Sequence, residues 1–152
     1  MVNFVNSEVS LELIKRYNRP GPRYTSYPTV PVWEEKNFSA EYLDCLHREG
    51  KSENPISIYI HIPFCKQLCT FCGCNKYITN SKELVEKYLK SLEKEIYTVA
   101  ENLINKKKLA EIHLGGGTPT FLSPKQLERL LDILISNFET NLVKEWSFEA
   151  DP

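Results

Sequence analysis

Four of the five cysteines fall between residues 65 and 74, so this stretch is the first place to look for chemistry. Cys65, Cys69 and Cys72 have the spacing C-x3-C-x2-C, and Cys74 follows two positions later. A closed zinc site usually takes four ligands from two separated pairs, and no second pair follows here. Three thiols in one compact loop fit an iron–sulfur cluster better, because they can hold a cube while one iron stays open. Structural zinc remains an alternative.

The bulk composition sets limits on function. The 152 residues are 41% hydrophobic and 26% charged, which is enough for one domain with a hydrophobic core. The net charge of −1 offers no basic field for nucleic acid or for a membrane surface. No run of about 18 apolar residues predicts a membrane span, and residues 1–8 do not resemble a signal peptide. We therefore expect a cytoplasmic protein, where clustered cysteines bind metal more often than they form disulfides.

The segment that leads into the cysteines is predicted to be a strand. Residues 55–63 alternate strictly, with four isoleucines on one face and Ser57, Tyr59 and His61 on the other. In a barrel-like α/β fold the isoleucines would meet the helices. Tyr59 and His61 would then face inward, toward the mouth where the cysteine loop begins. Active sites of such folds lie at the C-terminal ends of the strands.

Two further strands alternate with helices downstream. A helical repeat covers residues 82–105, and the three lysines at 106–108 are expected to be solvated at its C-terminal end. A short strand at 110–114 runs into the glycine motif, and Ser123-Pro124 opens another helix. A third strand is predicted over 145–150. The order strand, helix, strand, helix, strand predicts an α/β fold with parallel strands.

The N-terminal third is predicted to be helical and proline-rich. A short helix is expected over residues 9–18 and another over 39–49, with Tyr42, Leu43 and Leu46 on its buried side. Cys45 in this second helix is expected to be a buried thiol.

Between these helices lies a breaker-rich arm, residues 19–32, which contains Arg23 and Tyr24. The arm is either a strap on a domain surface or a segment that covers a ligand site. The predicted domains are an arm-and-helix region, 1–54, that covers the active site, and three βα units, 55–152.

Gly115, Gly116, Gly117 and Thr118 follow the second predicted strand. Successive glycines expose backbone N–H and C=O groups and let a ligand approach without a β-carbon in the way. A tight strand-to-helix turn would need the same residues. Glu149 near the end of the third strand is either a surface carboxylate or a group that projects to the same mouth.

The cysteine spacing after a strand resembles the signature of radical S-adenosylmethionine enzymes. In that family three cysteines hold a [4Fe-4S] cluster, and S-adenosylmethionine binds its open iron through amino and carboxylate groups. One electron then cleaves the sulfonium to give a 5′-deoxyadenosyl radical. The resemblance implies that the motif Gly115–Thr118 contacts the methionine portion and that Glu149 binds ribose hydroxyls.

The sequence further resembles the oxygen-independent coproporphyrinogen III oxidase family. Four segments carry this resemblance: Tyr59–Cys65, Cys72–Lys76, Gly115–Leu122 and Gly21–Thr29. A related heme-chaperone branch keeps the three cysteines but typically lacks the arm and has a bulky residue in place of Cys74. That branch remains an alternative.

The family resemblance implies a role for each site residue. The implied roles are cluster ligation by Cys65, Cys69 and Cys72, contact with a first S-adenosylmethionine by Tyr59, Gly116 and Glu149, and contact with a second by Phe71, Gly117 and Thr118. Cys74 is implied to be needed for activity without being a ligand, and His61 is a further candidate catalytic residue. The arm with Arg23 and Tyr24 would cover the tetrapyrrole.

The implied reaction is oxidative decarboxylation of coproporphyrinogen III to protoporphyrinogen IX in heme biosynthesis, with an unidentified electron donor. The family's core is a partial (β/α)6 barrel followed by a C-terminal domain, whereas this chain predicts three strands. We therefore expect the N-terminal half of the barrel, which alone would not convert substrate. A second chain is one source of the missing C-terminal half.

Overall fold

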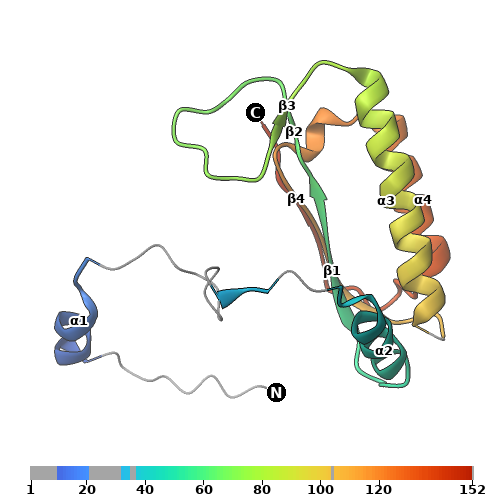
Figure 1. Ribbon diagram of the computed structural model, residues 1–152, viewed down its shortest axis with the longest axis horizontal. Coiled ribbons are helices and arrows are strands. Elements are labelled where there is room, and N and C mark those ends of the chain that lie inside the picture. The colour runs from blue at the N-terminus through green and yellow to red at the C-terminus, as the bar shows by residue number, and fades with distance from the viewer. Residues whose placement is uncertain (1–9, 21–31, 35–36, 104, 152) are drawn as a thin grey trace. The chain divides into compact units, whose positions relative to one another are not determined.

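A three-stranded parallel sheet forms the centre of the fold in a computed structural model that describes residues 10–20, 32–34, 37–103 and 105–151 (Figure 1). The strand order is β1-β4-β5, with β4 (Leu109–Gly116) paired to β1 (Ile56–Ile62) and to β5 (Glu145–Phe148). Helix α3 (Lys82–Asn102) connects β1 to β4, and α4 (Pro124–Asn137) connects β4 to β5. The predicted α/β fold with parallel strands is confirmed.

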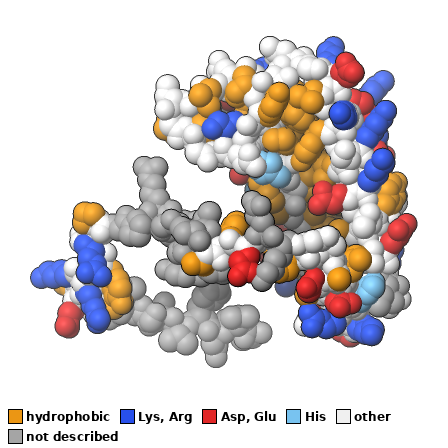
Figure 2. Space-filling model, viewed as in Figure 1, with side chains coloured by type: hydrophobic (Ala, Val, Ile, Leu, Met, Phe, Trp, Pro, Cys, Tyr) orange, Lys and Arg blue, Asp and Glu red, His pale blue; other side chains and the backbone are white. Residues whose placement is uncertain are grey.

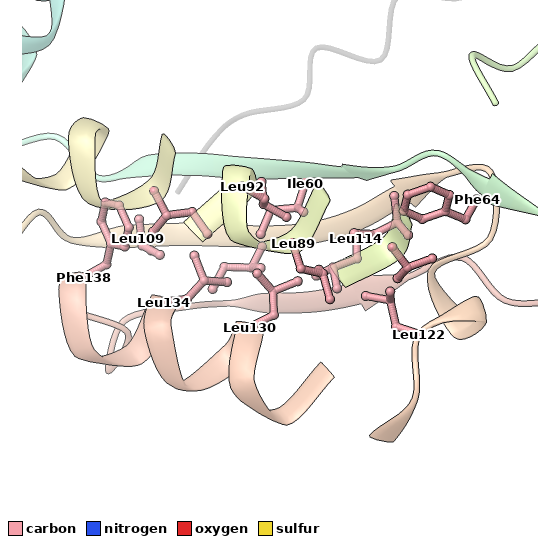
Figure 3. Packing of buried hydrophobic residues seen from close by; sticks show 14 of the residues in the cluster. Ile60, Phe64, Leu89, Leu92, Leu109, Leu114, Leu122, Leu130, Leu134 and Phe138 are labelled. Carbon is pink, nitrogen blue, oxygen red and sulfur yellow. The ribbon is translucent and has the colours of Figure 1, made fainter. Parts of the chain in front are cut away.

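Helices α3 and α4 cover one face of the sheet. Each begins at a serine whose side chain accepts a backbone N–H: Ser81 from Leu84, and Ser123 from Gln126 in a capping box with Pro124 next in the chain. Figure 3 shows side chains from both helices pointing toward the strands. The core residues are Ile60, Ile62, Phe64, Val85, Leu89, Leu92, Ile96, Leu103, Leu109, Ile112, Leu114, Leu122, Leu130, Leu134 and Phe138.

The isoleucine face of β1 packs as expected. Ile60 and Ile62 are buried in the core, while Ile56 and Ile58 are partly buried against it. The alternation therefore leaves the polar residues of β1 on the face that the helices do not cover. Figure 2 shows lysine and arginine side chains along the side that α3 forms, away from that face.

The chain divides into two compact units, residues 1–37 and 38–152. The smaller unit contains α1 (Leu11–Tyr17), which begins after Ser10, whose side chain accepts from Leu13 N. The predicted boundary after residue 54 differs from this division because α2 (Ser39–Gly50) packs against α3. Arg23 and Tyr24 lie outside the described residues, so their covering role stays a prediction.

Two expectations for α2 were wrong. Cys45 is exposed, and its sulfur accepts a hydrogen bond from the Arg48 guanidinium at 2.9 Å. Tyr42 is 53% exposed, although Leu46 on the predicted stripe does pack against the core. The reason is that the helix meets the core along a narrow strip at its C-terminal end, where Gly50 is buried.

Lys107 was expected to be solvated and is instead buried, with its side chain 4% exposed. Its Nζ donates to the backbone carbonyls of Glu49 and Ser52 at 2.6 Å each and lies 3.1 Å from Glu49 Oε1. A cation thus satisfies carbonyls at the C-terminal end of α2, where the helix dipole favours positive charge. Lys107 therefore fixes α2 to the start of β4.

We expect Lys107→Met to lower the free energy of unfolding by about 2 kcal/mol, because two partly buried carbonyls lose their charged donor. The control is Lys106→Met, since Lys106 is exposed in the same run. Urea unfolding at 25 °C measures both variants. Equal stability of the two variants would contradict the anchoring role of Lys107.

None of the helices among the described residues is long and apolar enough to cross a membrane.

Candidate functional site

The cysteine loop is fastened at both ends beside the C-terminal end of β1. It leaves through β2 (Phe64–Cys65) and returns through β3 (Tyr77–Ile78), and these two strands pair in parallel. Tyr77 N donates to Pro63 O at 2.6 Å, and Thr79 N donates to Cys65 O at 3.1 Å. Figure 1 shows the loop projecting from this end of the sheet. The strand predicted from the alternating isoleucines therefore delivers the cysteines to the carboxyl edge of the sheet.

A cavity of about 530 Å³ lies between this loop and the ends of β4 and β5. The predicted site residues that line it are Cys65, Cys69, Phe71, Cys72, Cys74, Gly116, Gly117, Thr118 and Glu149. Phe71 is 92% exposed at the rim. Asp151 also lines the cavity, although no pattern in the sequence predicted it as a site residue. The structure thus brings together residues that are more than 80 positions apart in the chain.

All five cysteines, each within the described part of the chain, are free thiols. Cys65 Sγ lies 3.5 Å from Thr118 Oγ1, and Cys69 and Cys72 are joined through their backbone by a hydrogen bond of 3.3 Å. Within the described ranges, no three metal-ligating side chains are close enough together to hold an ion. A common centre for the three sulfurs would therefore require the loop to close further, and metal binding would then be coupled to loop order.

The donor set nevertheless fits an iron–sulfur cluster. Four free thiols, those of Cys65, Cys69, Cys72 and Cys74, border one cavity, and thiolate sulfur is the ligand that such clusters take. The glycine motif makes room beside them: a β-carbon on Gly117 would lie 2.9 Å from Cys65 Sγ and 2.7 Å from Pro63 O. The pKa of Cys74 is raised, chiefly by a hydrogen bond with the Cys72 side chain.

Tyr59 and His61 lie on the face opposite the helices and are hydrogen-bonded to each other. His61 Nε2 is 2.7 Å from the carbonyl of Asn75, which can only accept, so this nitrogen carries a proton. In the neutral ring His61 Nδ1 therefore accepts from the Tyr59 hydroxyl at 3.0 Å. The pKa of Tyr59 is raised by burial first and then by the negative charges of Glu149 and Cys74. The phenol stays protonated at neutral pH.

Glu149 meets the glycine motif directly. Its Oε2 accepts from Gly116 N at 3.1 Å, and its own N–H donates to Leu114 O. Gly116 has φ of 117°, a conformation that side-chain-bearing residues rarely adopt. A β-carbon on Gly115 would lie 2.9 Å from the Tyr59 ring and 3.1 Å from Glu149 Oε1. Tyr59 and Glu149 therefore converge over Gly115.

Two residues of this face were missed as site residues from the sequence. His113 Nδ1 is 2.8 Å from Ser147 Oγ, and the His113 ring stacks on Tyr59 with centroids 5.7 Å apart. The available signal was strand alternation, which puts His113 on the same face as Gly115. Their pairing depends on strand register, which that signal does not give.

The radical SAM superfamily model matches residues 59–145. The chain belongs to this superfamily. It is 45% identical over 142 residues to the oxygen-independent coproporphyrinogen III oxidase of Salmonella typhimurium, covering 93% of this chain and 30% of that protein. The protein of the same name from Mannheimia haemolytica is 46% identical, with 93% of this chain and 95% of that protein covered.

A solved structure of coproporphyrinogen III oxidase from Escherichia coli, described as a radical SAM enzyme, resembles this chain with a TM-score of 0.75. The two are 41% identical, and the match covers 95% of this chain and 31% of that one. The chain thus spans about a third of the length of most relatives that it matches. Its strands correspond to the N-terminal part of the radical SAM barrel, as expected.

Proposed function

We propose that this chain is the cofactor-binding part of an oxygen-independent coproporphyrinogen III oxidase. The observation that carries the proposal is the cavity in which the C-x3-C-x2-C thiols face Gly116, Gly117 and Glu149. The similarity to oxidases of that name supports the substrate. In the complete enzyme the reaction converts two propionates of coproporphyrinogen III to vinyl groups in heme biosynthesis.

Cys65, Cys69 and Cys72 would hold three irons of a [4Fe-4S] cluster. When bound, the cluster and S-adenosylmethionine supply one-electron chemistry that begins with cleavage of the sulfonium. The chain's own part is to present three thiolates on a loop fastened by β2 and β3, and to keep the cavity side of the cluster open to a second ligand.

The glycine motif and two polar side chains would bind S-adenosylmethionine. Gly116 and Gly117 line the cavity beside the thiols, and the Tyr59 ring lies over Gly115. Glu149 Oε2 is held by Gly116 N, and its carboxylate would accept from ribose hydroxyls. Phe71, Gly117 and Thr118 border the same cavity and would contact a second S-adenosylmethionine.

Cys74 and His61 are the proposed catalytic residues outside the ligand set. Cys74 lines the cavity beside the proposed ligands. His61 carries a proton on Nε2, held by the Asn75 carbonyl, and accepts from Tyr59 at Nδ1. Both are placed to hold or move a proton near the cavity mouth.

We propose that coproporphyrinogen III binds at this mouth and that the arm with Arg23 and Tyr24 covers it, whereas α2 lies at the start of β4 and takes no part in the cover. Each propionate loses a β-hydrogen atom, carbon dioxide and one electron as it becomes a vinyl group. The complete enzyme therefore needs an electron donor for cofactor cleavage and an acceptor for the product electron. We further propose a cytoplasmic location, with a second chain as one source of the remaining barrel.

The test is anaerobic reconstitution of the 152-residue chain followed by separate assays of S-adenosylmethionine cleavage and coproporphyrinogen III conversion. We expect cluster assembly and slow cleavage with dithionite, without formation of protoporphyrinogen IX, because the chain spans about a third of most relatives. Conversion of coproporphyrinogen III by the isolated chain would contradict the proposal that it is only the cofactor-binding part of the enzyme. Stoichiometric heme binding would favour the heme-chaperone alternative, and one tightly held zinc would favour a binding module.

A further inference from the structure

A row of three polar side chains crosses the uncovered face of the sheet, two residues before the glycine motif begins on β4. Tyr59, His113 and Ser147 are register partners on β1, β4 and β5. The next row contains His61 and Gly115 on β1 and β4, with Glu149 following β5. The row therefore lies directly beneath the residues that converge on the cavity.

His113 contacts the polar members of both rows. Ser147 Oγ lies 2.8 Å from His113 Nδ1 and so fixes the plane of the imidazole. In that plane the other nitrogen, Nε2, lies 3.7 Å from Glu149 Oε1. The ring also stacks on Tyr59 with an interplanar angle of 15°. One imidazole thus touches both side chains that lie over Gly115.

The Glu149 carboxylate is approached from two sides. Gly116 N donates to Oε2 at 3.1 Å, and His113 Nε2 faces Oε1. The carboxylate is 53% exposed, so without these neighbours its torsions would be free to rotate in solvent. His113 and Ser147 lie on the face of the sheet that the helices do not cover, so their side chains are placed to act on Glu149.

We infer that His113 and Ser147 form a positioning pair that orients Glu149 and Tyr59 for S-adenosylmethionine. The inference rests on the proposed function for the identity of the ligand. The pair adds no contact to the ligand itself. It holds two contacting groups in one arrangement before binding, which saves the cost of ordering them on binding.

The first test measures S-adenosylmethionine dissociation constants on the anaerobically reconstituted chain. Ser147→Ala is expected to weaken binding about fivefold, the ratio that one ordinary hydrogen bond carries. His113→Ala is expected to weaken it about tenfold or more, since the contacts to both Tyr59 and Glu149 are lost. Iron and sulfide content should stay unchanged, because neither residue lines the cavity with the cysteines.

Ser57→Ala is the matched control. Ser57 is a serine of the same face, and its hydroxyl donates to Glu111 at 3.2 Å one row farther from the cavity. Its removal should leave the dissociation constant within about twofold of the unmodified chain, the scatter expected of distant sites. Equal effects of Ser57→Ala and Ser147→Ala would overturn the inference.

Two amide substitutions of His113 test its contact with Ser147 and its contact with Glu149 separately. His113→Asn keeps a hydrogen-bonding atom at the Nδ1 position near Ser147, whereas His113→Gln can reach the Nε2 position near Glu149. We expect His113→Gln to recover more of the S-adenosylmethionine affinity lost in His113→Ala than His113→Asn does. Affinity recovered by Asn alone would overturn the link to Glu149.

A second arm needs no cofactor. The chain has three histidines, so 15N-histidine labelling gives three resolvable imidazoles. Ser147→Ala and Glu149→Gln should each shift the nitrogens of the same imidazole, the one lost in His113→Ala. Different imidazoles, or no shift in Glu149→Gln, would overturn the inference even if S-adenosylmethionine binds. If both variants show these shifts but the unmodified chain binds no S-adenosylmethionine, the proposed function is contradicted, and with it the role assigned to the pair.

Discussion

Replacing Cys65, Cys69 or Cys72 with alanine removes the iron–sulfur cluster from the reconstituted chain. Each of the three thiols borders the same cavity, and three are needed to hold a cube that leaves one iron open. Two remaining thiols on an exposed loop leave two irons without protein ligands. We expect near-complete loss of bound iron and of the visible absorption in each variant.

Two other cysteines provide matched controls. Cys45 lies on α2, away from the loop, and Cys45→Ala should leave iron content unchanged. Cys74→Ala should also keep the cluster, because Cys74 is assigned to activity and not to ligation. Iron and acid-labile sulfide are measured for all five variants after one reconstitution protocol. A Cys74→Ala variant without iron, beside a Cys72→Ala variant that retains it, would reverse the assignment.

Gly117→Ala is expected to disturb both the fold and the site. The added β-carbon would lie 2.7 Å from Pro63 O and 2.9 Å from Cys65 Sγ. The first contact is with backbone, which cannot rotate away, and Gly117 N is itself bonded to Ile62 O. Overpacking of this kind costs about 3 kcal/mol at the upper end of its usual range. The Cys65 sulfur is displaced as well, so iron content should fall with stability.

The control for this substitution lies in the cysteine loop itself. In the described part of the chain, nothing is within 4 Å of a β-carbon placed on Gly73. Gly73→Ala should therefore leave the unfolding free energy within about 0.5 kcal/mol of the unmodified chain. Urea unfolding without metal separates the effect on the fold from the effect on the cluster. If Gly117→Ala and Gly73→Ala unfold at the same urea concentration, the close contact between Gly117 and the Pro63 carbonyl is contradicted.

Hydrophobic periodicity, together with capping residues and helix breakers, predicted most of the fold. Alternating isoleucines predicted β1 and its buried face, and the long apolar repeat predicted α3. These signals are strong because each depends on the local backbone period alone. The two-residue pairing of β2 with β3 gave no such signal, since two residues are too few to show a period.

Other features depend on tertiary contacts that no local pattern contains. Lys107 looks like its neighbours in the sequence, yet the backbone carbonyls of Glu49 and Ser52 receive it in the interior. Cys45 and Tyr42 lie in an amphipathic pattern, but α2 contacts the core along a strip too narrow to bury them. The width of that strip depends on how α2 packs against α3.

The candidate site likewise combines features that local sequence patterns show with features that depend on tertiary contacts. The cysteine spacing and the glycine motif have fixed separations along the chain, so they were visible in the sequence. The pair of His113 and Ser147 exists because β4 and β5 adopt one register, which places residues 34 positions apart side by side. A shift of that register by one residue would place Ser147 on the other face of the sheet.

We propose that this loop holds an iron–sulfur cluster and not zinc. It is tested most directly by metal and sulfide analysis of the unmodified chain after anaerobic reconstitution, together with its visible spectrum. We expect a brown protein with about four iron and four sulfide per chain and broad absorption at about 400 nm. A colourless protein that holds one zinc, takes up no iron and unfolds when a chelator removes the zinc would contradict it.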